Sequence, residues 1–447
     1  MAPVTGGMRS AALPHGVDDG VFPRDAHGAL PHEAHSALPR GVRGAADRNF
    51  ACAVRAFSQL FPHPRLGGGA LAIYLDGEPV VDVWTGWSDR RGKKRWDADT
   101  GTMVFSATKG MASTVVHRLA DRGLIDYDAP VAEYWSAFGA NGKSRVTVRE
   151  LMRHRAGLSQ LNRATMVDLM DHVLMEERMA AAPMGLLRGR PAYHAITYGW
   201  LLSGLARAVT GSGMRDLFRT ELAEPLDSDG FHLGRPPVDA ATQPAQIIGP
   251  QRHLQNPVFN FVAPHLAGLP FSGGFGSLYF RGMKSVVQGD TPMLDTEMPA
   301  ANGVATARAL ARMYAPIANG GMVGGRRFLS AELAAGLVGP RSLHPDGSIL
   351  MPMSFHLGYH GLPLGGIMPG LGHVGLGGSL GWADPDSGLS FGFVHNRLLT
   401  PLVVADQAGF VATAALIRYG VAQARKHGFS PIPTFGAPFA GSNSAAV

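Results

Sequence analysis

The sequence predicts an α+β fold in which an antiparallel sheet, flanked by N- and C-terminal helices, carries an inserted and mostly helical subdomain. Two β-prone runs, Ala70–Tyr74 and Val80–Trp84, flank Asp76-Gly77, a turn that is typical of antiparallel hairpins. Helical patterns then dominate residues 146–225. A later strand-like run, Leu389–Val394, precedes a closing helical pattern, so strands stand on both sides of the helices.

The elements follow one another in a consistent order. A strand-like run from Thr100 to Phe105 leads into Ser106, after which apolar residues recur every three or four positions until Gly123. The later helical patterns cover residues 148–155, 166–182, 198–209, 305–319 and 405–427.

Both ends of the chain differ in composition from the middle. Residues 1–45 contain scattered Pro and His without apolar periodicity, and residues 431–447 are rich in Pro, Gly and Ser. Such segments bury little apolar surface, so we predict a flexible N-terminal extension and a flexible tail. Between them we predict one two-part domain: a sheet subdomain of residues 46–105 and 303–430, and a helical subdomain of residues 106–302.

The composition limits the classes of partner. The net charge of +6 comes mainly from scattered arginines, because only six of the 40 basic residues are lysines. The densest basic cluster, Arg90–Arg95, follows the first hairpin and is interpreted as a solvated turn, so no nucleic-acid partner is expected. The basic surface leaves open a peripheral association with a membrane or cell envelope, and the sequence indicates no oligomeric state.

Cys52 is the single cysteine, so no internal disulfide can form, which fits a reducing compartment. No run approaches the ~20 apolar residues of a membrane-spanning helix, and the N-terminus lacks the apolar core of a signal peptide. The expected location is therefore the cytoplasm. The histidines of the N-terminal segment are irregularly spaced, so no metal or other cofactor is expected.

Ser106-Ala107-Thr108-Lys109 is an S-x-x-K sequence at the predicted start of a helix. Residues i and i+3 share a helix face, so the lysine amine is expected beside the serine hydroxyl. A serine hydroxyl needs a nearby base to become a nucleophile, and a lysine can be that base when burial lowers its pKa. Free N–H groups at a helix N-terminus also favour a developing oxyanion. The segment predicts nucleophilic catalysis at Ser106, with an ordinary helix cap as the alternative.

Further segments resemble the serine β-lactamase and penicillin-binding-protein superfamily, and within it the family VIII carboxylesterases and actinobacterial lipase/esterase proteins. Phe105–Gly110 is similar to the nucleophile segment of these proteins. Tyr193–Leu201 lies where they carry a Y-x-N motif, and His373–Gly375 matches the H-x-G that replaces K-T-G in the esterase branch. Other similar segments, in the family's order, are Thr147–Leu158, Glu224–Leu226 and Gly303–Ala311.

The resemblance, which spans roughly residues 50–430, implies roles for individual residues. Ser106 would attack the acyl carbon, Lys109 would hold its proton, and Tyr193 would relay the proton, with its phenol pKa lowered by the lysine ammonium. The backbone N–H groups of Ser106 and of Leu376, on the strand after the H-x-G, would form the oxyanion hole. The further substrate-lining residues implied are His373, Gly375 and Gly377.

Two positions depart from the β-lactamase pattern, because Ala195 replaces the Asn of Y-x-N and His373 replaces the Lys of K-T-G. In β-lactam binders that lysine pairs with the carboxylate of the drug, which a mostly neutral histidine does less well. Both changes favour neutral esters. Tyr198 is a second candidate phenol. Ser379 lies in a G-x-S-x-G sequence, but too little chain follows it for the other parts of an α/β-hydrolase.

We therefore expect a serine carboxylesterase that hydrolyses short-to-medium-chain acyl esters, small or lipid-like, through an acyl-serine intermediate. The irregular segment 236–300 is predicted to be a lid over an acyl pocket lined by Phe271 and Phe275, with plain core packing as the alternative. A β-lactamase, a DD-peptidase or an acyltransferase on the same fold is the alternative function. A catalytically inactive binding protein is disfavoured, because all three implied catalytic side chains are present.

Overall fold

The computed structural model describes residues 37–161, 164–249, 292–339, 343–349, 352–364, 366–398 and 403–439. All of these fall within the unit of residues 37–447. The predicted acyl-pocket residues Phe271 and Phe275, and most of the predicted lid, lie outside the described residues.

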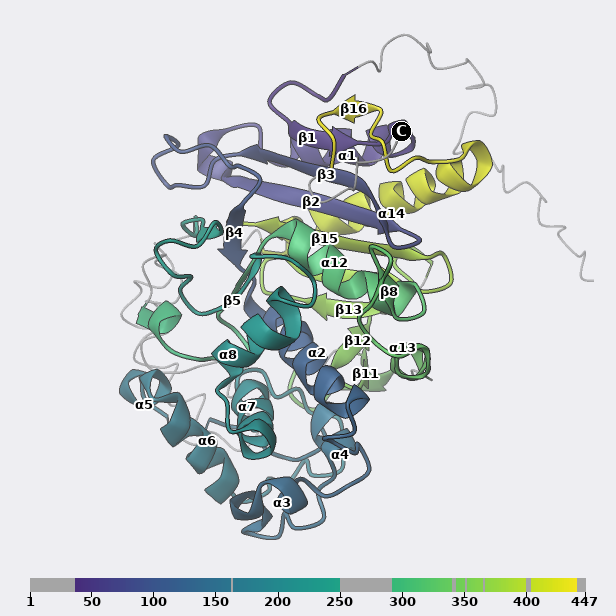
Figure 1. The fold of residues 1–447 in the computed structure, drawn as a ribbon. Coiled ribbons are helices and arrows are strands. Elements are labelled where there is room, and N and C mark those ends of the chain that lie inside the picture. The colour runs from purple at the N-terminus through teal and green to yellow at the C-terminus, as the bar shows by residue number, and fades with distance from the viewer. Residues whose placement is uncertain are drawn as a thin grey trace, which may run out of the picture. The chain divides into compact units, whose positions relative to one another are not determined.

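A ten-stranded antiparallel sheet runs through this unit in the order β10-β11-β12-β13-β14-β15-β2-β3-β1-β16 (Figure 1). Strands from the N-terminal part of the chain meet strands from the C-terminal part within this sheet, where β15 pairs with β2. This sheet confirms the predicted α+β class. The strands are β1 (Arg43–Ala46), β2 (Gly68–Leu75), β3 (Glu78–Gly86), β10 (His344–Pro345), β11 (Pro352–His356), β12 (Tyr359–Gly361), β13 (Leu371–Val374), β14 (Leu380–Asp384), β15 (Leu389–His395) and β16 (Phe435–Gly436).

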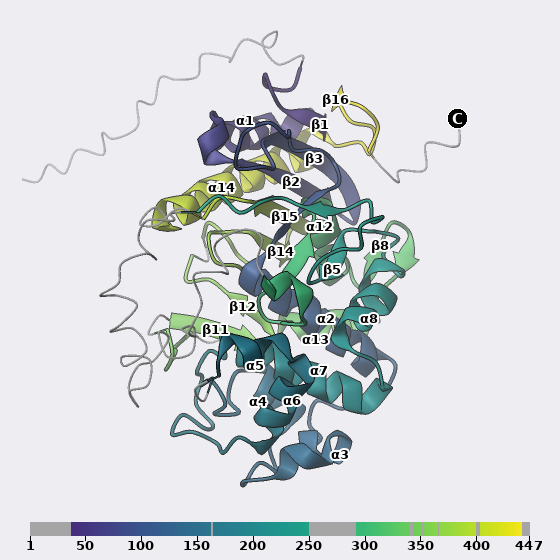
Figure 2. The ribbon, with the colours of Figure 1, turned by 90° about the vertical axis from the view of Figure 1, so that its left-hand side faces the viewer.

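Helices cover both faces of the sheet. On one face α1 (Ala51–Gln59) and α14 (Val403–His427) pack against each other, and on the other α12 (Ala307–Ala318) packs against β2, β14 and β15 (Figures 1 and 2). Under α1 and α14 lies a core that includes Phe57 and Phe393, whose rings meet edge to face. Each fully buried phenylalanine of this kind contributes about 1.5–3 kcal/mol to stability.

The helical part is built around α2 (Thr108–Asp121), which packs against α7 (Thr197–Thr210), α8 (Met214–Phe218) and β13. A small sheet in the order β5-β7-β4-β6 lies beside it, with β5 (Phe231–Leu233), β7 (Gly303–Ala305), β4 (Thr100–Met103) and β6 (Gln243–Pro244). The remaining elements are α3 (Val131–Tyr134), α4 (Val148–Met152), α5 (Met166–Met170), α6 (His172–Ala181), α13 (Ala331–Val338), β8 (Met322–Val323) and β9 (Arg326–Arg327).

The structure differs from the predicted elements at three places. The pattern over 166–182 forms two helices, because Asp171 leaves the helical conformation and its side chain caps α6 at the Leu174 N–H. Strand β1 begins inside the predicted N-terminal extension, and the predicted tail contains β16. These two strands pair with each other, and Phe435 is buried in the core under α14.

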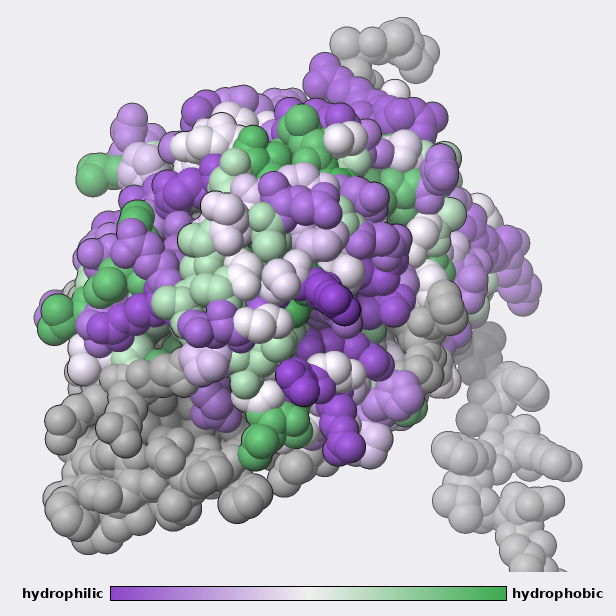
Figure 3. Space-filling view, turned by 90° about the horizontal axis from the view of Figure 1, so that it is seen from below, coloured by the Kyte–Doolittle hydropathy of each residue, from purple (hydrophilic) through white to green (hydrophobic). Residues whose placement is uncertain are grey.

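The face formed by the helical part is polar with scattered apolar groups (Figure 3). On the part of this face that is coloured, hydrophobic residues form small, separate groups among hydrophilic ones. Within the described ranges, none of the helices combines the length and the apolar character that crossing a bilayer requires.

Candidate active site

Ser106 lies at the bend between β4 and α2. The preceding residue, Phe105, has φ of +47°, a left-handed conformation that costs a non-glycine residue roughly 1–3 kcal/mol. A short 3-10 turn, Phe105–Ala107, then joins α2 and leaves Ser106 half-buried. The strain therefore serves to turn the chain sharply at Ser106, so that its hydroxyl faces the segments that follow.

Lys109 is fully buried one turn after Ser106. Its Nζ lies 3.2 Å from the Ser106 Oγ and donates hydrogen bonds to the Ala195 carbonyl at 2.6 Å and to the Ala300 carbonyl at 2.9 Å. Burial lowers the pKa of this amine well below its usual value. A neutral amine has two N–H bonds, which match the two carbonyls, and its lone pair then faces the serine hydroxyl.

Tyr193 brings a phenol to the same point from the segment that precedes α7. Its phenol lies close enough to the Ser106 side chain for Ser106 to lower its pKa, and its ring lies 4.9 Å from the Lys109 Nζ and stacks on Phe355. Burial raises the pKa of Tyr193, the Ser106 side chain lowers it and Asp346 raises it, with a net increase. The prediction that a lysine ammonium lowers this pKa is wrong, because burial of the phenol is the largest cause and raises it, and Lys109 is not among the groups that shift it.

The two backbone N–H groups implied for an oxyanion hole come from Ser106 and Leu376. Leu376 lies in the turn between β13 and β14 and not on a strand, and its side chain is 43% exposed. Within the described part of the chain, neither N–H donates to a protein acceptor. Gly375 brings this turn close, since a Cβ there would lie 2.1 Å from the Val104 carbonyl, two residues before Ser106.

His373 is fully buried beneath this turn and next to the Tyr193 ring. Burial lowers its pKa well below the usual value, so the imidazole is neutral. Its Nδ1 bonds to the Val374 carbonyl at 3.2 Å, while Nε2 has no partner among the described residues. Gly377 has φ of +88° and lies in the same turn.

The alternative nucleophile Ser379 and the alternative phenol Tyr198 both make hydrogen bonds within the fold. Ser379 is fully buried, and its hydroxyl bonds to the backbone of His395 on β15 at 3.2 and 3.4 Å. Tyr198, on α7, places its hydroxyl 2.9 Å from Ser113. Both hydroxyls therefore join elements of the fold.

The carbonyls of Ala195 and Ala300 are parts of the site that sequence reasoning missed. A backbone oxygen carries no residue signature, so no signal in the sequence could have identified them. His154 is a further histidine beside the site: it is fully buried, its Nδ1 accepts from the His194 N–H, and its ring packs 5.0 Å from the Tyr193 ring. Among the described residues, no three His, Cys, Asp or Glu side chains are placed to hold a metal ion.

The fold and the site define a serine hydrolase, and the chain belongs to the beta-lactamase family, whose model matches residues 50–416. It is 64% identical over 406 residues to Esterase/beta-lactamase LipL of Mycobacterium tuberculosis, an alignment that covers 91% of this chain and 94% of that protein. The resemblance that the motifs indicated is thereby confirmed, and the chain is an enzyme of the serine esterase type.

Solved structures agree with this relationship. A family VIII carboxylesterase is 30% identical with a TM-score of 0.71, covering 83% of this chain and 99% of the other. A penicillin-binding protein homologue from Caulobacter crescentus is 29% identical with a TM-score of 0.68, with the same coverage of both chains.

Proposed function

We propose that this protein is a serine carboxylesterase that hydrolyses short-to-medium-chain acyl esters through an acyl-Ser106 intermediate. Ser106 is the nucleophile, Lys109 the base and Tyr193 the proton relay. The observation that carries the proposal is the 3.2 Å contact between the Ser106 hydroxyl and a buried amine whose pKa is strongly lowered. A lowered pKa favours the neutral form of the amine, and the neutral form can accept the serine proton.

In the acylation step, the Ser106 oxygen bonds to the acyl carbon while its proton passes to the Lys109 amine. The backbone N–H groups of Ser106 and Leu376 stabilise the resulting oxyanion. The carbonyl then re-forms and the bond to the alcohol oxygen breaks. The protonated phenol of Tyr193 donates its proton to that oxygen and regains one from Lys109. Deacylation repeats these steps with water in place of serine.

Neutral esters suit this site better than β-lactams. Because His373 is buried and neutral, it offers no positive charge for the carboxylate of a β-lactam. The name of the relative LipL includes both esterase and beta-lactamase, so esters and β-lactams are the two substrate classes to compare. We expect turnover of p-nitrophenyl butyrate to exceed that of nitrocefin by a wide margin. Comparable rates for the two substrates would favour the β-lactamase alternative.

The nucleophile can be identified directly. We expect mass spectrometry of protein treated with a fluorophosphonate probe to find the label on Ser106, and Ser106→Ala to remove both labelling and ester hydrolysis. Label on Ser379, or activity retained in Ser106→Ala, contradicts the proposal. The predicted acyl-pocket residues Phe271 and Phe275 can be tested separately, because Ala at either position should change the preference between acyl chain lengths and leave labelling intact.

A further inference from the structure

The amine of Lys109 is held by two backbone carbonyls from distant parts of the chain. Ala195 lies just before α7, and Ala300 lies in the loop Met293–Asn302 that precedes β7. Among the described residues no carboxylate contributes to the lowered pKa of Lys109, which comes from burial. The two carbonyls are therefore the backbone acceptors that orient the amine.

A buried amide closes the loop that carries Ala300. Asn302 is fully buried, and its Nδ2 donates to the Met293 carbonyl at 2.6 Å and to the Thr296 carbonyl at 2.8 Å. Its Oδ1 accepts from the Met298 N–H at 3.0 Å. One side chain thus ties together three backbone groups and fixes the turn that presents the Ala300 carbonyl.

The next residue anchors the loop beside Ser106. The Gly303 N–H donates to the Thr108 hydroxyl at 2.9 Å, and the Gly303 carbonyl accepts from the Val104 N–H at 2.9 Å. Both partners lie within two residues of Ser106. The position of the loop is therefore fixed relative to the turn that carries Ser106.

Helix α7 makes room for the same loop at Gly199. A Cβ at this position would lie 2.4 Å from the Ala300 nitrogen and 2.7 Å from the Pro299 carbonyl carbon. Side chains essentially never approach backbone this closely, so a larger residue at position 199 must push the loop away. The absence of a side chain here lets Ala300 reach the amine.

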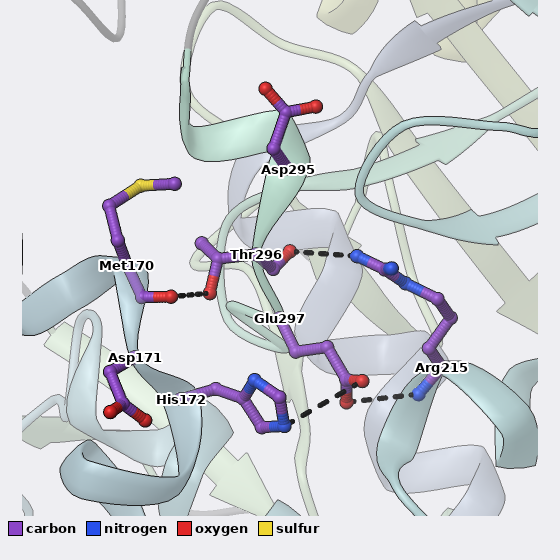
Figure 4. A pocket seen from close by; sticks show the side chains of 7 residues that line it. All are labelled: Met170, Asp171, His172, Arg215, Asp295, Thr296 and Glu297. Carbon is purple, nitrogen blue, oxygen red and sulfur yellow. Dashed lines mark hydrogen bonds and ion pairs between the residues drawn. The ribbon is translucent and has the colours of Figure 1, made fainter.

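The other side of the loop is tethered at a separate pocket of about 440 Å³ (Figure 4). There the Thr296 hydroxyl donates to the Met170 carbonyl at 2.9 Å, and the Glu297 carboxylate accepts from the Arg215 N–H at 3.1 Å. The His172 imidazole lies 3.8 Å from the same carboxylate. The loop is therefore held from the pocket side as well as by Asn302.

We infer that Asn302 and Gly199 are positioning residues that hold the Ala300 carbonyl on the Lys109 amine and so set the reactivity of Ser106. The inference rests on the proposed function, in which Lys109 is the base. Neither residue touches the reacting atoms, so both act through Ala300. Loss of the carbonyl removes a stabilising acceptor from the ammonium form and leaves the lone pair of the neutral amine less well directed.

The first test compares two glycines of α7. Gly199→Ala displaces Ala300, whereas Gly204→Ala meets the Trp135 ring instead, 2.3 Å from the added Cβ. We expect the acidic limb of kcat/KM for p-nitrophenyl butyrate to move about one pH unit lower in Gly199→Ala, with a plateau about tenfold lower. Gly204→Ala should lose stability without a shift of the limb.

The second test compares two asparagines and does not depend on the folding of Gly199→Ala. Asn396 is also buried and ties three backbone groups, the Gly68 N–H and the Trp87 and Gln246 carbonyls, and none of these partners in the described part of the chain is a residue that holds Lys109. Asn302→Ala should shift the pH profiles of ester hydrolysis and of fluorophosphonate labelling to lower pH. Asn396→Ala should lose stability and keep both profiles.

The outcomes separate this inference from the proposed function. Unshifted profiles in Gly199→Ala and Asn302→Ala, equal shifts in the matched controls, or a shift to higher pH overturn the positioning role while Ser106 remains the nucleophile. Retained activity in Ser106→Ala overturns the proposed function instead.

Discussion

Lys109 and Lys143 are both fully buried, yet their surroundings differ in one decisive respect. Each amine donates to two backbone carbonyls and lies over an aromatic ring, that of Tyr193 for Lys109 and that of Phe138 for Lys143. Only Lys109 also contacts a serine hydroxyl. Burial lowers the pKa of both amines. The decrease is larger for Lys109 than for Lys143, because the residues next to Lys143 in the chain are exposed.

The comparison teaches that a buried lysine held by carbonyls is a structural unit in itself. It becomes a candidate catalytic base only where the fold adds a hydroxyl and a phenol. The same contrast holds for the two phenols, since the Tyr193 phenol interacts with Ser106 while the Tyr198 hydroxyl is hydrogen-bonded to Ser113. Each proposed catalytic residue therefore has a counterpart of the same type that stabilises the fold, and the pairs supply matched controls.

The largest expected effect separates the two lysines. Lys109→Met should lower kcat/KM for p-nitrophenyl butyrate by about 10³-fold or more, because the serine loses its base. Lys143→Met should stay within about threefold of wild type, since the contacts of that amine with described residues are two carbonyls and a ring. Steady-state kinetics on variants with matching circular dichroism spectra measure both. Equal losses in the two variants would remove the distinction between the two sites.

The next effect separates the two phenols. Tyr193→Phe should lower kcat by about 10²-fold, because the leaving alcohol loses its proton donor. Tyr198→Phe should leave kcat nearly unchanged and cost about 1 kcal/mol of stability through its lost hydrogen bond to Ser113. Kinetics together with urea unfolding measure the pair. The reverse ranking in kcat would assign the relay to Tyr198.

A smaller effect is expected in how the free energy of unfolding depends on pH. The pKa of Lys109 is lower in the folded than in the unfolded state, so between these two values the unfolded chain binds the extra proton. Stability therefore rises with pH across this window, by up to roughly 1 kcal/mol per pH unit, towards about pH 10. Lys109→Met should flatten this rise more than Lys143→Met, as measured by urea unfolding at several pH values. A wild-type slope in Lys109→Met would show that its pKa is not lowered.

The smallest effect is expected at the second serine. Ser379→Ala removes a hydroxyl that links the turn after β13 to β15, so it should cost about 1 kcal/mol of stability. Ester hydrolysis should stay within about threefold of wild type, in contrast to Ser106→Ala. Thermal unfolding and steady-state kinetics test this, and loss of fluorophosphonate labelling in Ser379→Ala would count against it.

Local patterns predicted much of the fold. Asp76 and Gly77 both adopt positive φ in the hairpin turn between β2 and β3, as a two-residue turn of this type requires. Gly211 ends α7 in the left-handed conformation. The break at Asp171 was missed, because continuous apolar spacing concealed a capping side chain. The pairing of β1 with β16 was missed, because it joins the two ends of the unit and short strands carry weak patterns.

The S-x-x-K spacing was enough to bring Ser106 and Lys109 together, because residues three apart in a helical turn are neighbours whatever surrounds them. The tertiary structure decided the rest. It set the pKa of Lys109 through burial, supplied the carbonyls of Ala195 and Ala300, and raised the pKa of Tyr193 where the sequence had predicted a decrease. Desolvation and backbone acceptors depend on which distant segments pack together, and no local spacing encodes that.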